Sequence, residues 1–203
     1  MFGNAPKALW ERWSPADSLN RIDLACRCLL VLDGKKRILF ETGIGSFFSP
    51  KYKDRYGIQG TEHLLLENLS QMGLSDLDID VVVLSHLHFD HAGGLLSSWN
   101  KDESPKLLFP NATFLVGEAQ WNRANSPHSR DKASYIPELQ RLLKASGRLQ
   151  IVNAAHHKSL GLDYRFHLSD GHTPGLMLTE IKSSQGPVLF ASDLIPGRAW
   201  VHR

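Results

Sequence analysis

The sequence contains only two cysteines among its 203 residues, Cys26 and Cys28. A fold held together by several disulfides is therefore excluded. On an expected strand, the spacing of two puts both side chains on one face and roughly parallel, which is a poor geometry for a disulfide. We expect both cysteines to be small buried side chains rather than a metal or redox site.

A long hydrophobic run is also missing. The longest one, residues 24–32, is interrupted by Arg27 and is much too short to span a bilayer. The first 13 residues contain no apolar segment of the kind that a secretory signal needs. A cytoplasmic protein without a membrane partner is therefore the default expectation.

Charge of one sign is not in excess either. The chain has 23 Lys and Arg residues against 21 Asp and Glu residues, and its formal net charge is +2. Without a basic block or stripe, there is no electrostatic case for a nucleic-acid partner. Repeats, low-complexity tracts and linker-like breaks are absent as well, so residues 1–203 are expected to form a single domain.

What the chain does have is an intermixed pattern of strands and helices, which predicts a layered α/β architecture. Strands are expected at residues 25–32, 37–41, 79–84, 112–116, 149–152, 164–168, 176–181 and 188–191. Helices are expected at residues 61–72, 92–99 and 135–146, with a helical turn at 118–124. Residues 46–60, rich in aromatic and basic side chains, are expected to form either a surface loop or a lid over a site.

The densest chemical signal follows the apolar run 79–84. Three histidines and an aspartate lie within six residues: His86, His88, Asp90 and His91. Imidazole nitrogen and carboxylate oxygen are the ligands that zinc and neighbouring transition metals prefer. One ion cannot easily take all four from so short a loop. The spacing therefore predicts two metals, with His86 and His88 on one and Asp90 and His91 on the other.

Other segments can complete these sites. His172 lies in a Gly/Pro-rich turn between two expected strands, and Asp193 directly follows the expected strand 188–191. Gly93 and Gly94 are expected to let the backbone turn sharply beneath the ions.

Together these segments resemble the metallo-β-lactamase superfamily. Its hallmark His-x-His-x-Asp-His matches at residues 86–91, Gly-His-Thr-Pro-Gly at 171–175, and a strand followed by Ser-Asp-Leu at 192–194. Within the superfamily, residues 1–11, 130–135 and 193–196 are similar to the branch that includes quorum-quenching acyl-homoserine-lactone lactonases.

The resemblance implies an αββα sandwich with the metals in a groove at one edge of the two sheets. His86, His88 and His172 would bind the first metal, Asp90 and His91 the second, and Asp193 both. Two divalent ions are implied; zinc is the usual occupant, and iron or manganese is an alternative. The implied activity is hydrolysis, in which a metal-bound hydroxide opens a lactone or a related small-molecule ester. Asp90 would carry a proton to the leaving alkoxide, and a homodimer is possible in such a family.

The chain departs from the family pattern after Asp193. Relatives supply a further histidine to the second metal, whereas here the only later histidine is His202, which lies in a stretch resembling a pocket wall. We therefore expect a sandwich truncated at the C-terminus, and at the N-terminus as well, that is poorly stable and binds the second metal weakly. Trp200 is expected to line the substrate pocket.

Two other readings stay open. A single iron held by ligands such as His86, His88 and Asp193 would suit a thiol or persulfide dioxygenase of the same fold. A metal-binding fragment without catalytic activity would explain the absent ligand. The remaining histidines, such as His63, are expected to have structural or solvated roles.

Overall fold

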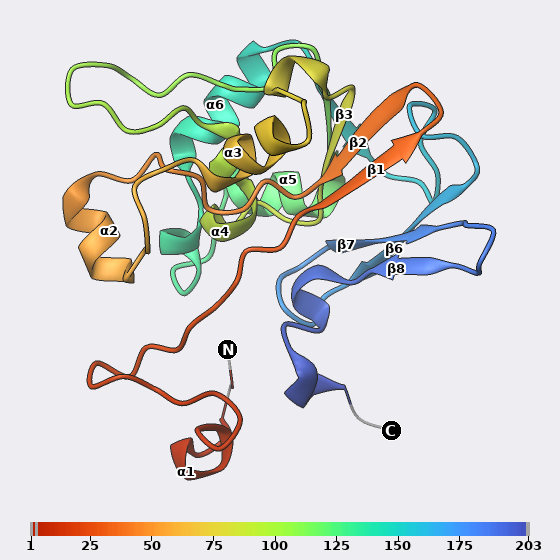
Figure 1. Cartoon of the computed structure of the whole chain (residues 1–203). Coiled ribbons are helices and arrows are strands. Elements are labelled where there is room, and N and C mark those ends of the chain that lie inside the picture. Colours follow the sequence, from red (N-terminus) through yellow and green to blue (C-terminus); the bar gives the residue numbers. More distant parts are fainter. Residues whose placement is uncertain (1, 3, 202–203) are drawn as a thin grey trace.

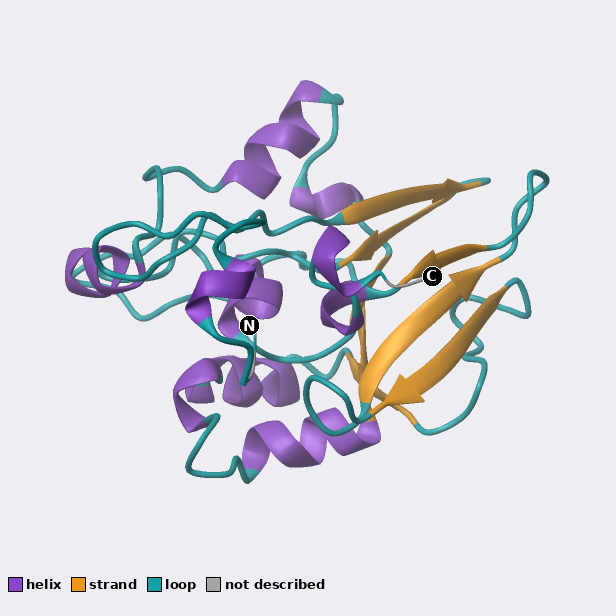
Figure 2. Cartoon of the chain, turned by 90° about the horizontal axis from the view of Figure 1, so that it is seen from below, coloured by secondary structure: helices purple, strands orange, loops and turns teal. Residues whose placement is uncertain are grey.

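Two β-sheets are stacked face to face, and helices cover the outer face of the larger one (Figures 1 and 2). The structure is a computed structural model, and it describes residue 2 and residues 4–201. The strands are β1 (Leu29–Asp33), β2 (Lys36–Phe40), β3 (Val81–Leu84), β4 (Thr113–Gly117), β5 (Leu149–Val152), β6 (Tyr164–Ser169), β7 (Leu176–Ile181) and β8 (Val188–Phe190). The α-helices are α1 (Lys7–Trp10), α2 (Pro50–Tyr56), α3 (Leu64–Gln71), α4 (Phe89–Ala92), α5 (Glu118–Asn125) and α6 (Pro137–Ala145). Short 3₁₀ helices are η1 (Asp76–Asp78), η2 (Gly93–Leu95), η3 (Lys132–Ser134), η4 (Ser192–Leu194) and η5 (Arg198–Trp200).

The larger sheet has the order β1-β2-β3-β4-β5. Its first pair is antiparallel, and β2 to β5 are parallel. The smaller sheet, β6-β7-β8, is antiparallel throughout. The carboxyl ends of parallel strands meet at one edge of a sheet, where polar loops can converge. The layered α/β architecture expected from the sequence is confirmed.

Alternation along the central strands divides the interior into two cores. Leu39, Val82 and Leu84 face the helices, while Ile38 and Val83 face the second sheet. Since successive side chains of a strand point to opposite faces, a strand buried on both sides must be apolar throughout. Strand β3 meets this requirement, because all four of its residues are buried.

The outer face of the smaller sheet is open among the described residues. His167, Glu180 and Leu189 lie there, and Leu189 is 50% exposed. The second helical layer of the expected αββα sandwich is not found in the part of the chain that the structure describes. None of the described helices has the length and apolar character that a bilayer crossing requires.

The N-terminal arm differs from expectation. Strand β1 begins only at Leu29, so residues 25–28 lie outside it. Cys26 is exposed, and Cys28 is half-buried. The prediction of two buried cysteines on one strand face was therefore wrong for both residues, since neither lies in a strand and neither is fully buried. Figure 1 shows the arm leaving the body of the molecule toward α1. Phe2 in this arm stacks on Trp200 near the other end of the chain, with ring centroids 4.9 Å apart.

Candidate metal centre

The loop that follows β3 is anchored from both sides by buried polar groups. The backbone N–H of Ser85 donates to Glu41 Oε1 at 3.0 Å, and that of Leu87 donates to Gln120 Oε1 at 3.4 Å. The chain then enters α4, which carries Asp90 and His91, with His88 just ahead of it. The expected helix at 92–99 is instead the short η2, because the chain leaves the helical path after Leu95.

Close backbone approach explains the two glycines after this helix. A Cβ on Gly93 would stand 2.5 Å from Ile44 O, and one on Gly94 would overlap Thr42 O. Gly93 has an ordinary right-handed conformation, with φ −65°, and Gly94 has no positive φ. A sharp backbone turn, which was the reason expected for glycine at these two positions, is therefore wrong. Glycine is needed because the loop after β2 lies directly against both residues and leaves no room for a side chain.

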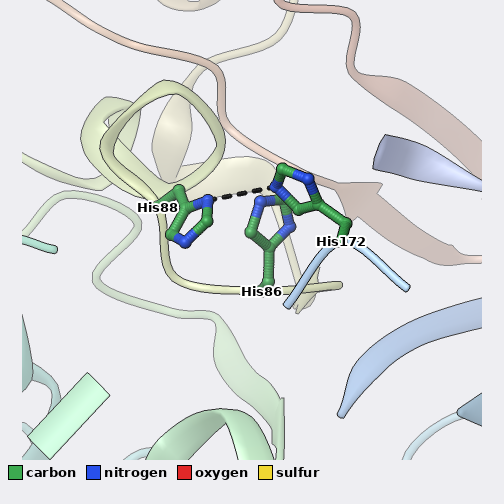
Figure 3. Close-up of side chains that lie close together, drawn as sticks. All are labelled: His86, His88 and His172. Atoms are coloured by element: carbon green, nitrogen blue, oxygen red, sulfur yellow. Dashed lines mark hydrogen bonds between the residues drawn. The ribbon is translucent and has the colours of Figure 1, made fainter. Parts of the chain in front are cut away.

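His86, His88 and His172 point toward one another from two loops (Figure 3). One ring nitrogen from each lies within 4.8 Å of the other two. His88 Nδ1 and His172 Nε2 are 3.2 Å apart. These three side chains were expected from the sequence to share one metal, and the structure brings them together.

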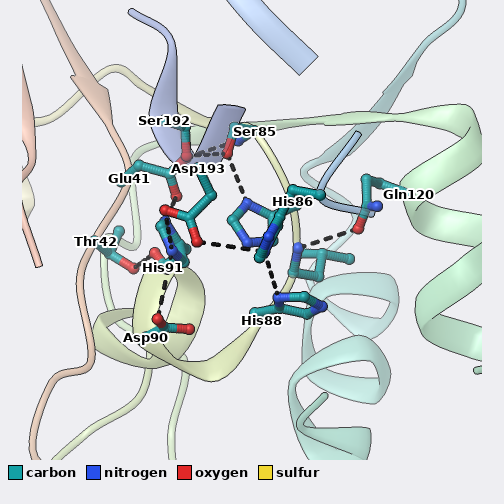
Figure 4. Close-up of polar contacts among 12 residues, drawn as sticks. Glu41, Thr42, Ser85, His86, His88, Asp90, His91, Gln120, Ser192 and Asp193 are labelled. Atoms are coloured by element: carbon teal, nitrogen blue, oxygen red, sulfur yellow. Dashed lines mark hydrogen bonds and ion pairs between the residues drawn. The ribbon is translucent and has the colours of Figure 1, made fainter. Parts of the chain in front are cut away.

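A second group comprises Asp90, His91 and Asp193, again with ligand atoms within 4.8 Å of one another. His91 Nε2 is 3.5 Å from Asp90 Oδ2 and 3.3 Å from Asp193 Oδ1. The other oxygen of Asp193, Oδ2, is 3.3 Å from His172 Nε2. Figure 4 shows Asp193 beside His91 and Asp90. Asp193 therefore presents one oxygen to each group.

Burial and charge give the two groups different character. Burial lowers the pKa of His88 to about 4, and it also lowers the pKa of His86 and His172. Neutral imidazole, the form that binds a metal, is thus favoured in the first group.

The second group concentrates negative charge around one ring. Burial lowers the pKa of His91, but Asp193, Asp90 and Glu41 outweigh it and hold that pKa well above its usual value. Burial raises the pKa of Asp90 and of Asp193, but their contacts with His91 outweigh it and both pKa values fall below the ordinary one. A site with three carboxylates around one imidazole favours the binding of a cation.

The side chains gathered in the two groups are suitable ligands for divalent metal ions. His86 is 0% exposed, and its Nδ1 is 2.8 Å from Ser85 Oγ. Its Nε2 is buried without a hydrogen-bond partner in the described chain, and so is Nε2 of His88. A buried polar atom left unpaired is costly, and a metal is one of the partners that removes this cost. Four imidazoles and two carboxylates form a set that zinc, iron and manganese all accept.

Sequence reasoning missed two buried residues that contact the proposed ligands or the loops that carry them. Gln120 is fully buried in α5, and its amide nitrogen donates to Thr173 Oγ1 and Pro174 O next to His172. Glu41, 1% exposed, follows β2 and faces His91 Nδ1 at 3.6 Å. A carboxylate at the end of an expected strand is the signal that singled out Asp193, and Glu41, the last residue of the expected strand 37–41, shares it.

Other sequence predictions have mixed outcomes. Residues 46–60 contain α2, and Phe48 and Tyr56 pack on Phe89, with ring centroids 5.3 and 5.0 Å from it. Trp200 lines a pocket of about 410 Å³ together with Trp13, Arg27 and Arg198. His202 lies outside the described residues. His63 has a structural role, since its Nε2 is 3.0 Å from Gly94 O.

Comparison with known proteins identifies the family. The model of the metallo-beta-lactamase superfamily matches residues 21–202. The chain belongs to the metallo-beta-lactamase superfamily. The resemblance seen in the motifs is thus confirmed, and the histidine and aspartate groups above lie within the superfamily domain.

Individual relatives of this superfamily domain include lactonases. An N-acyl homoserine lactonase from a Bacillus species is 27% identical over 183 residues, which are 85% of this chain and 64% of that protein. A probable metal-dependent hydrolase from Staphylococcus aureus superposes with a TM-score of 0.80 at 27% identity, over 93% of this chain and 65% of that one. AidC, a dizinc quorum-quenching lactonase solved with a product, superposes with a TM-score of 0.62 at 30% identity, over 83% of this chain and 56% of that one. The chain spans less than two thirds of the length of these relatives.

Proposed function

We propose that this protein is a metal-dependent hydrolase that opens a lactone ring or cleaves a related small-molecule ester. The observation that carries the proposal is the position of Asp193, whose two oxygens lie 3.3 Å from His91 Nε2 and 3.3 Å from His172 Nε2. A carboxylate so placed can bind one ion on each side. The lactonase relatives named above support the substrate class.

The ligands divide into two sets. His86, His88 and His172 would hold the first ion, Asp90 and His91 the second, and Asp193 both, with zinc as the expected metal. Divalent ions bound there would act as Lewis acids, lowering the pKa of a bound water to about 7 and polarising a carbonyl.

The chain's own residues supply positioning and proton transfer. Asp90 is the most open of the carboxylates around His91, with a side chain 36% exposed against 19% for Asp193 and 1% for Glu41. It can therefore reach a substrate as well as its own ion, and we assign it the transfer of a proton to the leaving alkoxide. Phe89, which lies between His88 and Asp90, packs against Phe48 and Tyr56 and so holds the segment 46–60 against the helix that carries Asp90 and His91.

The test combines metal content with turnover. The purified protein is expected to contain zinc and to hydrolyse lactones from a panel of varied acyl length, and removal of metal by a chelator should abolish this activity. One iron per chain together with oxygen consumption on a thiol or persulfide would instead support a dioxygenase. Tightly bound metal with no hydrolysis of any lactone or ester would overturn the proposal.

A further inference from the structure

Glu41 is a buried carboxylate in an unusual backbone position. It follows β2, is 1% exposed, and has a left-handed φ of 62°. Ser192, which directly precedes Asp193, also has a left-handed φ, 45°. Such conformations are strained in residues other than glycine and persist where the surrounding structure holds them in place. The two strained residues touch, since Ser192 Oγ donates to Glu41 Oε1 at 3.5 Å.

We propose that Glu41 is a positioning residue for both halves of the metal centre. It would act on His91 directly and on His86 through Ser192 and Ser85. This inference rests on the proposed function, because it assigns a role to the groups behind the proposed ligands.

The path to His86 is a chain of hydroxyl groups (Figure 4). Ser85 Oγ is 2.8 Å from His86 Nδ1 and donates to Ser192 Oγ at 2.9 Å. Ser192 Oγ in turn donates to Glu41 Oε1. A carboxylate oxygen only accepts hydrogen bonds, so it fixes the direction of every donor in the chain. His86 must then donate from Nδ1, which leaves the lone pair of its buried Nε2 free for a metal.

The path to His91 is direct. Glu41 Oε2 is buried, makes no hydrogen bond within the described residues, and faces His91 Nδ1 at 3.6 Å. An acceptor behind Nδ1 favours the proton there and leaves Nε2 to face Asp90 and Asp193. The single carboxyl group thus sets which ring nitrogen of one histidine in each ligand set would face a metal.

Two substitutions separate the paths. Glu41→Gln keeps an acceptor for Ser85 and Ser192 but places an amide donor against His91 Nδ1. Ser85→Ala removes the hydroxyl that contacts His86 and leaves the bond from the Ser85 backbone to Glu41 in place. We expect Glu41→Gln to lower the zinc affinity of the site that includes His91 by 10–100-fold. Ser85→Ala should lower the affinity of the site that includes His86 by a similar factor, as measured for groups that orient metal ligands.

The experiment is a competitive chelator titration of the whole protein with zinc. Cobalt absorption spectra of each variant distinguish the two sites, and thermal unfolding of the metal-free protein reports stability. Selective loss of one site, with the metal-free unfolding midpoint close to that of the parent, supports a positioning role. Glu67→Gln, on the exposed face of α3, is the matched control and should bind as the parent does.

Failure of this inference is distinguishable from failure of the proposed function. A parent protein that binds zinc and hydrolyses lactones, with both ions equally tight in Glu41→Gln and Ser85→Ala, would overturn the role of Glu41 alone. Equal weakening of both ions together with a lower metal-free midpoint would also overturn it, in favour of a purely structural role. If Glu41→Gln does not fold, the zinc titration of Ser85→Ala is the test. Unchanged affinity for both ions in Ser85→Ala would then count against the proposal.

Discussion

Gln120 Nε2 donates to Thr173 Oγ1 at 3.0 Å, although the two residues are 53 positions apart in the sequence. The same side chain accepts from the backbone N–H of Leu87 and donates to Pro174 O. One buried amide therefore joins the loop that carries His86 and His88 to the loop that carries His172. The geometry of the first ligand set depends on this join, because its members come from both loops.

Replacing Gln120 by Leu should disturb stability and metal binding together. The substitution keeps a similar volume but leaves the buried N–H of Leu87 and the carbonyl of Pro174 without their partner. Unsatisfied buried groups cost roughly 1–3 kcal/mol each, so we expect a loss of about 3 kcal/mol in the free energy of unfolding. Urea unfolding measures this loss, and a zinc titration should show weaker binding. Gln71→Leu, at an exposed position of α3, should change neither quantity.

Gly94→Ala tests the close approach beneath the centre. The new Cβ would overlap the carbonyl oxygen of Thr42, a backbone atom that cannot rotate away. Overpacking of this kind costs about 1–3 kcal/mol or more, and we expect the upper end of that range, with a fall in zinc affinity. Gly117→Ala is the control, because its Cβ would meet no atom closer than 3.6 Å. Thermal unfolding that shows equal midpoints for the two variants would contradict the close-packing account.

The sequence was most informative where ligands cluster locally. His86, His88, Asp90 and His91 lie within six residues, and strand β3 before them is apolar throughout. The layered fold and the family could be predicted from these features and from the turns around His172 and Asp193. The ligand roles themselves stay a prediction, which the metal analysis above addresses.

What could not be predicted depends on contacts between distant segments. Nothing near Gln120 in the sequence shows that its amide will meet Thr173, and a glutamine in a helix is ordinarily a surface residue. The exposure of Cys26 was missed for a related reason. Its apolar neighbours suggested a strand, but strand pairing begins only at Leu29, and the described residues of the arm before it have no sheet partner. Local pattern cannot show where pairing stops.

Acid should destabilise the protein partly through His63. Burial lowers the pKa of this side chain in the folded state. The unfolded chain, with a pKa near 6.5, therefore takes up the proton first, and the stability contributed by neutral His63 is lost as pH falls below about 6.5. His63→Asn keeps a residue suited to cap α3 and removes the titration. The free energy of unfolding from urea curves at pH 7, 6 and 5 should fall less steeply in this variant than in the parent.

The control for this pH effect is His128→Asn, since His128 is exposed in a loop. It should follow the parent at all three pH values. If His63→Asn also follows the parent, the buried contact between His63 and Gly94 does not contribute to the acid sensitivity.

Asp90→Asn tests the residue assigned to both the second ion and proton transfer. Asparagine keeps the size of the side chain but removes the charge and the carboxylate that would accept a proton. We expect lactone hydrolysis to fall by at least about 100-fold in kcat, within the range found for loss of a general acid or base. Zinc binding at the second site, which is expected to be the weaker one in the parent, should weaken further, since Asp90 belongs to the group with His91 and Asp193. Asp54→Asn, on the exposed side of α2, is the matched control and should retain full activity. Unchanged hydrolysis by Asp90→Asn at full metal content would remove Asp90 from both roles and leave proton transfer to another group near the centre.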